Sequence, residues 1–233
     1  MKFANKLVKA KFIKRYKRFF SEHILEDGKT VIAHCANTGA MTGVNSRGMT
    51  TWLLENNDPK RKLKWSWELC QINSTFIGIN THNPNKIIEE AIINKNITKL
   101  KGFSSYKREV KYGENSKIDF LLTHPKKPDC YLEIKNVHLS RKRNIAEFPD
   151  TVTARGKKHM QELTKVKLSG KRAIILYLIQ RNDCKYFKIA KDIDNEYYEE
   201  FCNAINLGVE VICVDTILSK NKIVIGKPIK PLI

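Results

Sequence analysis

Polar and apolar positions follow two different patterns, which change near residue 83. Before that point come short runs of β-forming residues separated by turn residues: LVKAKFIKRYKRFF, TVIAHCA, MTTWLLEN, LKWSWELCQI and STFIGIN. Strands of this length at regular spacing are typical of a small barrel or sandwich. The Gly-rich stretch NTGAMTG lacks the ending of a phosphate loop and predicts a barrel turn. We therefore expect a five-stranded OB-like barrel over residues 1–82.

Helical and strand patterns mix over residues 83–233, which predicts an α/β domain. KIIEEAIINKNI has the spacing of an amphipathic helix that begins near Asn83 and Pro84, where Asn can cap and Pro suits the first turn. Two more helices are expected in PDTVTARGKKHMQELTKVKLSG and NEYYEEFCNAINLG, ending at Gly170 and Gly208. The runs IDFLL, CYLEIKNV, RAIILYLIQ and VEVICVDTIL have the composition of strands.

The net charge is +19, from 43 Lys and Arg against 24 Asp and Glu. So large an excess repels itself in a compact chain unless a polyanion is often nearby. Nucleic acid is the leading candidate partner. An anionic membrane surface is the lesser one, because no basic amphipathic helix stands out.

The remaining composition favours a cytoplasmic protein. The longest apolar run, AIILYLI, is far shorter than the ~20 residues of a membrane span. The basic N-terminal segment has no separate apolar core, so we expect no signal peptide. The six cysteines are scattered without CxxC or paired Cys/His spacing, which predicts reduced thiols and no zinc site.

A basic and aromatic segment, KFIKRYKRFF, lies in the first expected strand. Its cations are Lys11, Lys14, Arg15, Lys17 and Arg18. Cations follow phosphates and flat rings stack on bases, so the segment as a whole predicts contact with nucleic acid. Each ring taken alone (Phe12, Tyr16 or Phe19) is better interpreted as filling the barrel.

A candidate site lies where IDFLL and CYLEIKNV pair as an antiparallel hairpin. The loop between them, THPKKPD, is centred on residue 126. That centre sets Asp119 opposite Glu133, with Cβ atoms ~5 Å apart. Lys135, two residues further on, faces the same side. A register offset by one residue would separate these side chains.

Two facing carboxylates repel each other, and both stay ionised only if a cation lies between them. Lys135 alone would make a structural ion-pair cluster. A divalent metal serves better, because Mg²⁺ prefers one or two carboxylates, a backbone carbonyl such as that of Ile134, and retained waters. Lys135 would then orient or deprotonate a metal-bound water for attack on a phosphodiester.

The acidic residue, the spacing and the Glu-Ile-Lys tripeptide resemble the D-x(n)-(D/E)-x-K core of the PD-(D/E)xK nuclease superfamily. That resemblance implies an acid on a preceding helix, for which Glu109 stands at the expected place. It also implies a polar residue after a later strand. Gln180 would be this residue and would contact the nucleic acid. The implied metal is Mg²⁺ or Mn²⁺, held by Asp119, Glu133, the Ile134 carbonyl and Glu109.

Longer segments resemble the sugar fermentation stimulation protein A family. They are AHCANTGAMTG, PKRKLKWSWELC, INTHNPN, REVKYGENSKIDFLL, YLEIKNVHLS, FPDTVTARGKKHMQELTKVKLSGKRAIILYLIQR and NEYYEEFCNAINLGVEVICV, in order along essentially the whole chain. Membership implies a DNA-binding protein with an OB-like domain, a nuclease-like domain and a regulatory effect on sugar metabolism. One departure is Lys117, where the family more usually has Arg. Lysine keeps the positive charge but lacks the paired N–H donors with which a guanidinium binds a phosphate.

The helix expected after the hairpin carries further candidates. Arg155, Lys158 and His159 share one helical face. They form either a phosphate clamp beside the metal or an exposed basic face, and His159 as a metal ligand is the weaker interpretation. Asp150, after Pro149, is expected to cap this helix.

The leading hypothesis is a cytoplasmic DNA-binding protein with a metal-dependent site that hydrolyses phosphodiester bonds. The alternative is a non-catalytic, largely non-specific DNA-binding regulator that uses a nuclease-like fold for binding. Two carboxylates would repel a polyanion, so a surface that only binds DNA has no use for them. Their presence modestly favours hydrolysis. RNA stays open as a substrate, because OB-like barrels bind either polymer.

Overall fold

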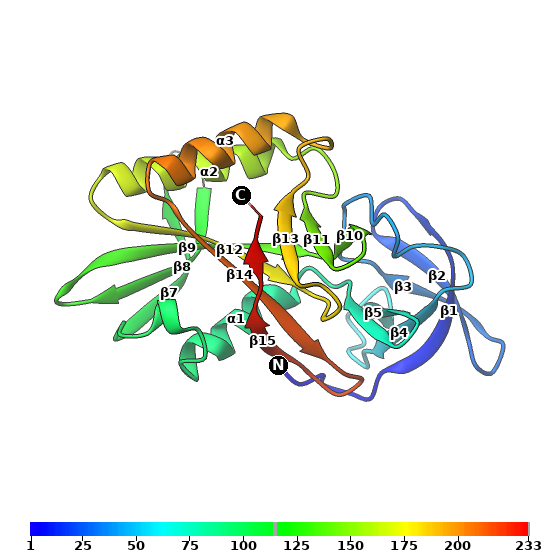
Figure 1. The fold of residues 1–233 in the computed structure, drawn as a ribbon. Helices are drawn as coiled ribbons and strands as arrows, with labels where there is room; N and C mark the ends of the chain where they lie inside the picture. Colours follow the sequence, from blue (N-terminus) through cyan, green and yellow to red (C-terminus); the bar gives the residue numbers. More distant parts are fainter. Residues whose placement is uncertain (114–115, 233) are drawn as a thin grey trace.

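The N-terminal part of the chain folds into a closed barrel, at the right of Figure 1. The computed structural model describes residues 1–113 and 116–232. The strands of the barrel region are β1 Val8–Tyr16, β2 Phe20–Leu25, β3 Thr30–His34, β4 Thr50–Glu55, β5 Trp65–Ile72 and β6 Thr75–Gly78. Their order is β3-β2-β1-β4-β5-β6, and a parallel pairing of β3 with β5 closes the ring. β6 therefore extends β5 outside a five-stranded barrel, as predicted.

The five strands of the ring are not the five expected runs, because β2 carries polar residues on its inner side. Ser21 and His23 are fully buried in the barrel. The His23 ring nitrogens lie 2.8 Å from Ser21 Oγ and 2.9 Å from Thr51 Oγ1, so the buried polar groups are paired. Burial lowers the pKa of His23 to about 3, which keeps the ring neutral. Hydrophobic periodicity does not detect such a strand.

A six-stranded sheet forms the centre of the second domain. Its strands are β7 Ser105–Tyr112, β8 Ser116–His124, β9 Lys127–Val137, β12 Arg172–Ile179, β14 Glu210–Leu218 and β15 Ile223–Pro228. They lie in the order β15-β14-β12-β9-β8-β7, and β12 pairs in parallel with both neighbours. A strand in this position is covered on both faces, as its continuous apolar run predicts.

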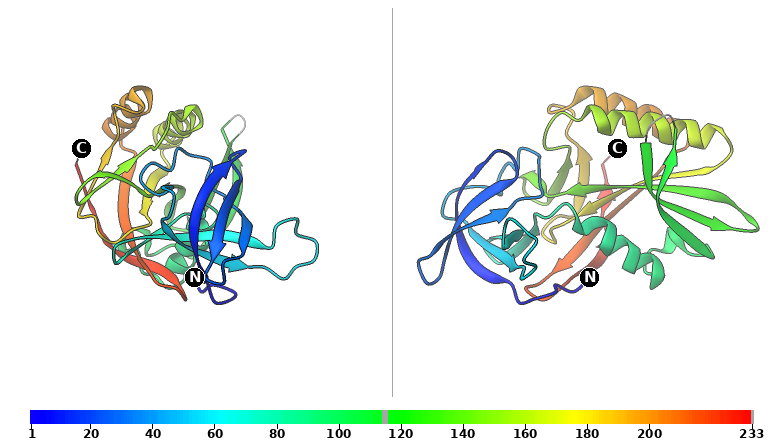
Figure 2. Two further views of the ribbon diagram at one scale, coloured as in Figure 1. Left: turned by 90° about the vertical axis from the view of Figure 1, so that its right-hand side faces the viewer. Right: turned by 180° about the vertical axis from the view of Figure 1, so that it is seen from behind.

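Three α-helices cover the two faces of this sheet in the described part of the chain. They are α1 Asn83–Ile93, α2 Ala154–Leu168 and α3 Asn195–Asn206, with a short 3₁₀ helix at Thr98–Leu100. Alternate residues of β12 separate two cores: Ile174 and Leu176 pack with α1, whereas Ile175 and Tyr177 pack with α2 and α3. The ribbon views show α2 and α3 side by side, with α1 across the sheet from them (Figures 1 and 2). No helix in residues 1–113 and 116–232 is long and apolar enough to cross a membrane.

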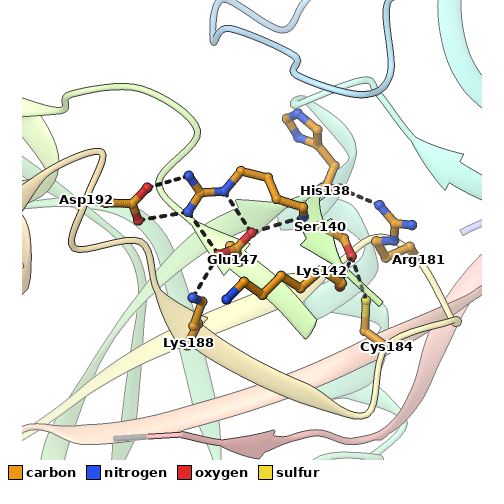
Figure 3. A network of polar contacts seen from close by, with 9 residues as sticks. His138, Ser140, Lys142, Glu147, Arg181, Cys184, Lys188 and Asp192 are labelled. Atoms are coloured by element: carbon orange, nitrogen blue, oxygen red, sulfur yellow. Dashed lines mark hydrogen bonds and ion pairs between the residues drawn. The ribbon is translucent and has the colours of Figure 1, made fainter. Parts of the chain in front are cut away.

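A smaller sheet links the site-bearing strand β9 to helix α2. Its strands are β10 Leu139–Lys142, β11 Ile145–Phe148, β13 Tyr186–Ile189 and β16 Lys230–Pro231. Glu147, 1% exposed, accepts hydrogen bonds from Arg141, and Lys188 lies 3.2 Å from it (Figure 3). Burial alone would raise the pKa of Glu147, but the hydrogen bonds from Arg141 and Lys188 lower it. Arg141 also binds Asp192, which fastens β10 to the segment after β13.

The two domains contact each other through the first residues of the chain and through the loop between β3 and β4. The Met1 amino group donates to the Ile223 carbonyl at 2.8 Å, so the first residues pack on the α/β domain. The NTGAMTG segment connects β3 to β4 and also reaches the second domain, because Met41 N donates to Asp150 Oδ2 at 3.0 Å. A side chain at Gly39 would collide with the same carboxylate, so a larger residue there would require the Asp150 side chain to shift.

Both predicted N-terminal helix caps are wrong. α2 begins four residues after Asp150, too far for that side chain to reach the first turn. Its N-cap is Thr153, whose Oγ1 accepts from Gly156 N at 3.0 Å. At α1 the Asn83 side chain makes no cap either, because its amide donates to Glu68 Oε2 at 2.7 Å.

Candidate active site

The predicted hairpin register is confirmed. Phe120 pairs with Leu132, so Asp119 and Glu133 are the next two opposed positions of β8 and β9. Asp119 Oδ2 accepts a hydrogen bond from Ile134 N at 2.7 Å, and the carboxylate thereby bridges the two strands. Local strand pairing alone therefore places both acids on one side of the hairpin.

An open cavity of about 410 Å³ lies over these acids. Seven of the residues considered for the site line it: Glu109, Asp119, Glu133, Ile134, Lys135, Arg155 and His159. Residues that were not predicted join them from the start of α1, above all His82 and Asn85. The cavity lies where β7, β8 and β9 meet the N-terminal ends of α1 and α2.

Glu133 is held as a buried carboxylate with one oxygen free. It is 3% exposed. Its Oε1 accepts from Lys135 Nζ at 2.9 Å and contacts His159 Nδ1. Burial by itself raises the pKa of Glu133, but the charge of Lys135 and the hydrogen bond from His159 bring it below the ordinary value. Its Oε2 is buried and has no hydrogen-bond partner among the described residues, which is unusual for a carboxylate.

Asp119 differs from Glu133 because its partners are neutral. It accepts from Ile134 N and, at 2.9 Å, from Asn85 Nδ2 of α1. Burial raises the pKa of Asp119, and the negative charge of Glu133 raises it further against these hydrogen bonds. The two carboxylates therefore repel each other, and a divalent cation between them would relieve that repulsion.

Glu109 lies at the cavity but not on a helix, so that part of its expected placement is wrong. It is an exposed residue of β7 with φ of 51°. The flanking pairs of β7 with β8 set it opposite Asp119. The helix that faces Asp119 is α1, and it presents the amide of Asn85 instead of an acid.

α2 contributes His159, which sequence reasoning treated as a weak candidate metal ligand. Arg155 Nε donates to His159 Nε2 at 3.3 Å. The ring nitrogen that accepts from arginine carries no proton, so the other nitrogen, Nδ1, is the one that donates to Glu133 Oε1. The i, i+4 spacing of Arg155 and His159 is the sequence signal for this pair. Lys158, expected on the same face, lies 3.9 Å from Glu162 and does not line the cavity.

Gln180 does not reach the cavity. It is fully buried, and its Nε2 donates to Asn136 Oδ1. Its backbone carbonyl accepts from Gly78 N at 2.9 Å, so this residue lies in the contact between β6 and the α/β domain. Burial in that contact prevents the expected approach of Gln180 to nucleic acid.

Four cations of the first predicted strand are exposed at the surface, and the fifth, Arg15, makes hydrogen bonds within the protein. Lys11, Lys14, Lys17 and Arg18 are exposed. Lys17 and Arg18 have positive φ values of 48° and 60° and form the turn between β1 and β2. Arg15 instead donates to the carbonyls of Asn37 and Gly39, so it braces the loop that contacts the second domain.

The three rings of the same segment differ in how deeply they are buried. Phe12 is 3% exposed and stacks on Trp67 inside the barrel, which confirms the core interpretation for this ring. Tyr16 is partly buried and stacks on Phe20. Phe19 is 48% exposed, so the core interpretation is wrong for this residue.

Comparison with known proteins gives matches over almost the whole chain. A family model described as the SfsA N-terminal OB domain matches residues 13–79, and one described as the sugar fermentation stimulation protein RE domain matches residues 82–222. A sugar fermentation stimulation protein homolog from Jannaschia sp. is 47% identical over 231 residues, covering 98% of this chain and 96% of that protein. A homolog of the same name from Agrobacterium fabrum is 44% identical over 230 residues, covering 99% and 96%.

Among solved structures, Pyrococcus furiosus SfsA in complex with Ca²⁺ matches with a TM-score of 0.91 at 25% identity. The match covers 100% of this chain and 98% of that one. The arrangement of both domains is therefore shared with that protein.

Proposed function

Because the chain belongs to the sugar fermentation stimulation protein family, we propose that it binds DNA and hydrolyses phosphodiester bonds with a divalent metal ion. The observation that carries this proposal is Oε2 of Glu133, which has no hydrogen-bond partner in the described part of the chain and is buried beside Asp119 at an open cavity, with Lys135 adjacent. Most buried side-chain oxygens have a hydrogen-bond partner, so an oxygen without one that lies beside a second carboxylate suits a bound cation.

The residues present fit a hard divalent cation. The donors are oxygens: Asp119, Glu133 Oε2, exposed Glu109 and, as the sequence predicts, the Ile134 carbonyl. The described residues, 1–113 and 116–232, contain no group of three His, Cys, Asp or Glu placed to hold a metal ion, so Mg²⁺ or Mn²⁺ would need retained waters to complete its ligands. The Pyrococcus furiosus relative was solved with Ca²⁺, an ion with the same preference for oxygen. When bound, the metal would supply Lewis-acid stabilisation of charge on the phosphate.

The protein residues around the acids have separate tasks. His159 donates to Glu133 and keeps that carboxylate oriented, with its ring position set by Arg155. Lys135 Nζ lies 2.9 Å from Glu133 Oε1 and lines the cavity, where it would orient an attacking water. Arg155 and Arg108 also line the cavity, and a guanidinium suits a phosphate group.

Nucleic acid as the substrate is supported by charge. The net charge of +19 favours a polyanionic partner, and four exposed cations of the β1 segment lie on the barrel. A regulatory effect on sugar metabolism, implied by the family name, would follow from DNA binding with or without cleavage.

The proposal is tested by cleavage of single- and double-stranded DNA and RNA with Mg²⁺ or Mn²⁺. Wild type is compared with Glu133→Gln and Lys135→Met, and binding is measured in parallel without divalent metal. Glu196→Gln is the matched control, because it neutralises an exposed acid of α3 outside the cavity. We expect metal-dependent product that is lost in both site variants and kept in the control. Binding without product in wild type would make this a DNA-binding protein that has no nuclease activity.

A further inference from the structure

A row of three aromatic rings leads from the barrel to the cavity. Phe19 stands in the connection between β1 and β2, His34 ends β3, and His82 immediately precedes α1. The rings of Phe19 and His34 are parallel within 1°, with centroids 6.4 Å apart. Those of His34 and His82 are inclined by 28° at 6.2 Å, and His82 lines the cavity that holds the two carboxylates.

The row lies at the surface and has no other assignment in the fold. Phe19 is 48% exposed, His82 is exposed and His34 is partly buried. Within the described residues none of the three belongs to a hydrophobic core cluster, and neither imidazole makes a side-chain hydrogen bond. Burial first, and then the charges of His82 and Arg61, lower the pKa of His34, so this ring is neutral at neutral pH.

Cations accompany the row at both ends. Lys17 and Arg18 precede Phe19 in the exposed turn of the barrel. Arg108 and Arg155 line the cavity at the other end, beyond His82. Ring faces flanked by cations are the combination with which proteins hold an unpaired strand, through stacked bases and a neutralised backbone.

We infer that Phe19, His34 and His82 form a track on which successive unpaired bases stack, so that one strand of nucleic acid passes from the barrel to the carboxylates. In an intact duplex both faces of each base are already covered, and a protein reaches the edges in the grooves. The faces of this row therefore suit single-stranded nucleic acid or an unpaired end. This inference rests on the proposed function and names the substrate class of the same site.

The track is tested by binding of a fluorescent oligothymidylate of about 20 nucleotides and of a duplex of equal length, in EDTA. Phe19→Ala and His82→Ala should each weaken single-strand binding roughly fivefold to a hundredfold, as loss of a stacking ring does. Duplex affinity should change less than about twofold. Tyr186→Ala is the control, because it removes a ring that is 39% exposed on β13, outside the row.

Two further variants separate stacking from packing at the same position. Phe19→Trp should keep single-strand affinity, whereas Phe19→Leu, which retains apolar bulk without a ring face, should lose it as Phe19→Ala does. The track is overturned if Leu serves as well as Phe, if single-strand and duplex affinities fall equally, or if the row variants match Tyr186→Ala. Wild type that binds neither probe would overturn the proposed function itself, while the preceding outcomes leave that function standing.

Discussion

Replacing Lys135 by Met should destabilise the protein in a way that depends on pH. Lys135 Nζ lies 2.9 Å from Glu133 Oε1, and the two side chains are 11% and 4% exposed. Methionine keeps most of the packing of the lysine stem and removes the charge. The Glu133 carboxylate then remains buried with His159 as its partner.

The expected magnitude follows from the burial of this pair. Removing one member of a buried ion pair costs about 3–5 kcal/mol, because a charge is left uncompensated. His159 still contacts the same oxygen and retains part of that stabilisation. We therefore expect a loss of about 2–3 kcal/mol in the free energy of unfolding at neutral pH. For a chain of this length that corresponds to a fall in Tm of roughly 4–12 °C.

The pH dependence comes from Glu133. Burial raises its pKa, and in wild type the charge of Lys135 and the hydrogen bond from His159 more than offset that effect. The lowered folded pKa contributes stability that is present above the unfolded pKa and is lost as the pH falls through the folded pKa. In the variant, burial is less opposed and the pKa rises, so ionised Glu133 becomes costly as the pH increases. The difference between the two proteins should be small at about pH 4 and complete at about pH 7.5.

Urea unfolding in EDTA, followed by tryptophan fluorescence over this pH range, measures the difference. Lys157→Met is the control, because it removes an exposed lysine of the same α/β domain, and it should change stability little at any pH. Adding Glu133→Gln to Lys135→Met should recover most of the loss. Equal destabilisation at both ends of the pH range, or no recovery in the double variant, would show that packing is the cause and refute the reasoning.

Three other outcomes are expected. Asp119→Asn should weaken Ca²⁺ binding, measured by calorimetry, at least about tenfold. The metal-free variant should be at least as stable as wild type, because the repulsion between Asp119 and Glu133 is relieved. Unchanged Ca²⁺ affinity would argue against a metal at this carboxylate. Affinity for DNA should fall by orders of magnitude between about 50 and 200 mM salt, and a flat salt titration would be incompatible with phosphate contacts. Arg141→Ala should lower the free energy of unfolding by about 1–3 kcal/mol, because it removes hydrogen bonds to buried Glu147. Asp192→Ala, at the exposed end of the same network, should lower it much less. Equal losses in the two variants would contradict this view of the network.

Local features of the sequence were sufficient for the hairpin and the domain classes. A short loop with a definite centre determines which residues oppose each other, and the two-residue period of strands determines which share a face. Asp119, Glu133 and Lys135 could therefore be placed together from the sequence alone. The continuous apolar run of β12 likewise indicates a strand that is covered on both faces.

Other features depended on segments that are distant in the sequence. His159 reaches Glu133 because α2 packs on the sheet, and Asn85 reaches Asp119 because α1 packs on its other face. β2 escaped prediction because its buried Ser21 and His23 are satisfied by partners that hydrophobic periodicity does not reveal.

The aromatic row and the placement of Gln180 were decided by tertiary structure alone. Phe19, His34 and His82 come from three separate segments, and each is an ordinary residue in its own local context. Gln180 ends a strand as expected, but contact with β6 buries it. Periodicity and turn length set relations over a few residues, whereas the faces that meet across a molecule are set by how whole cores pack together.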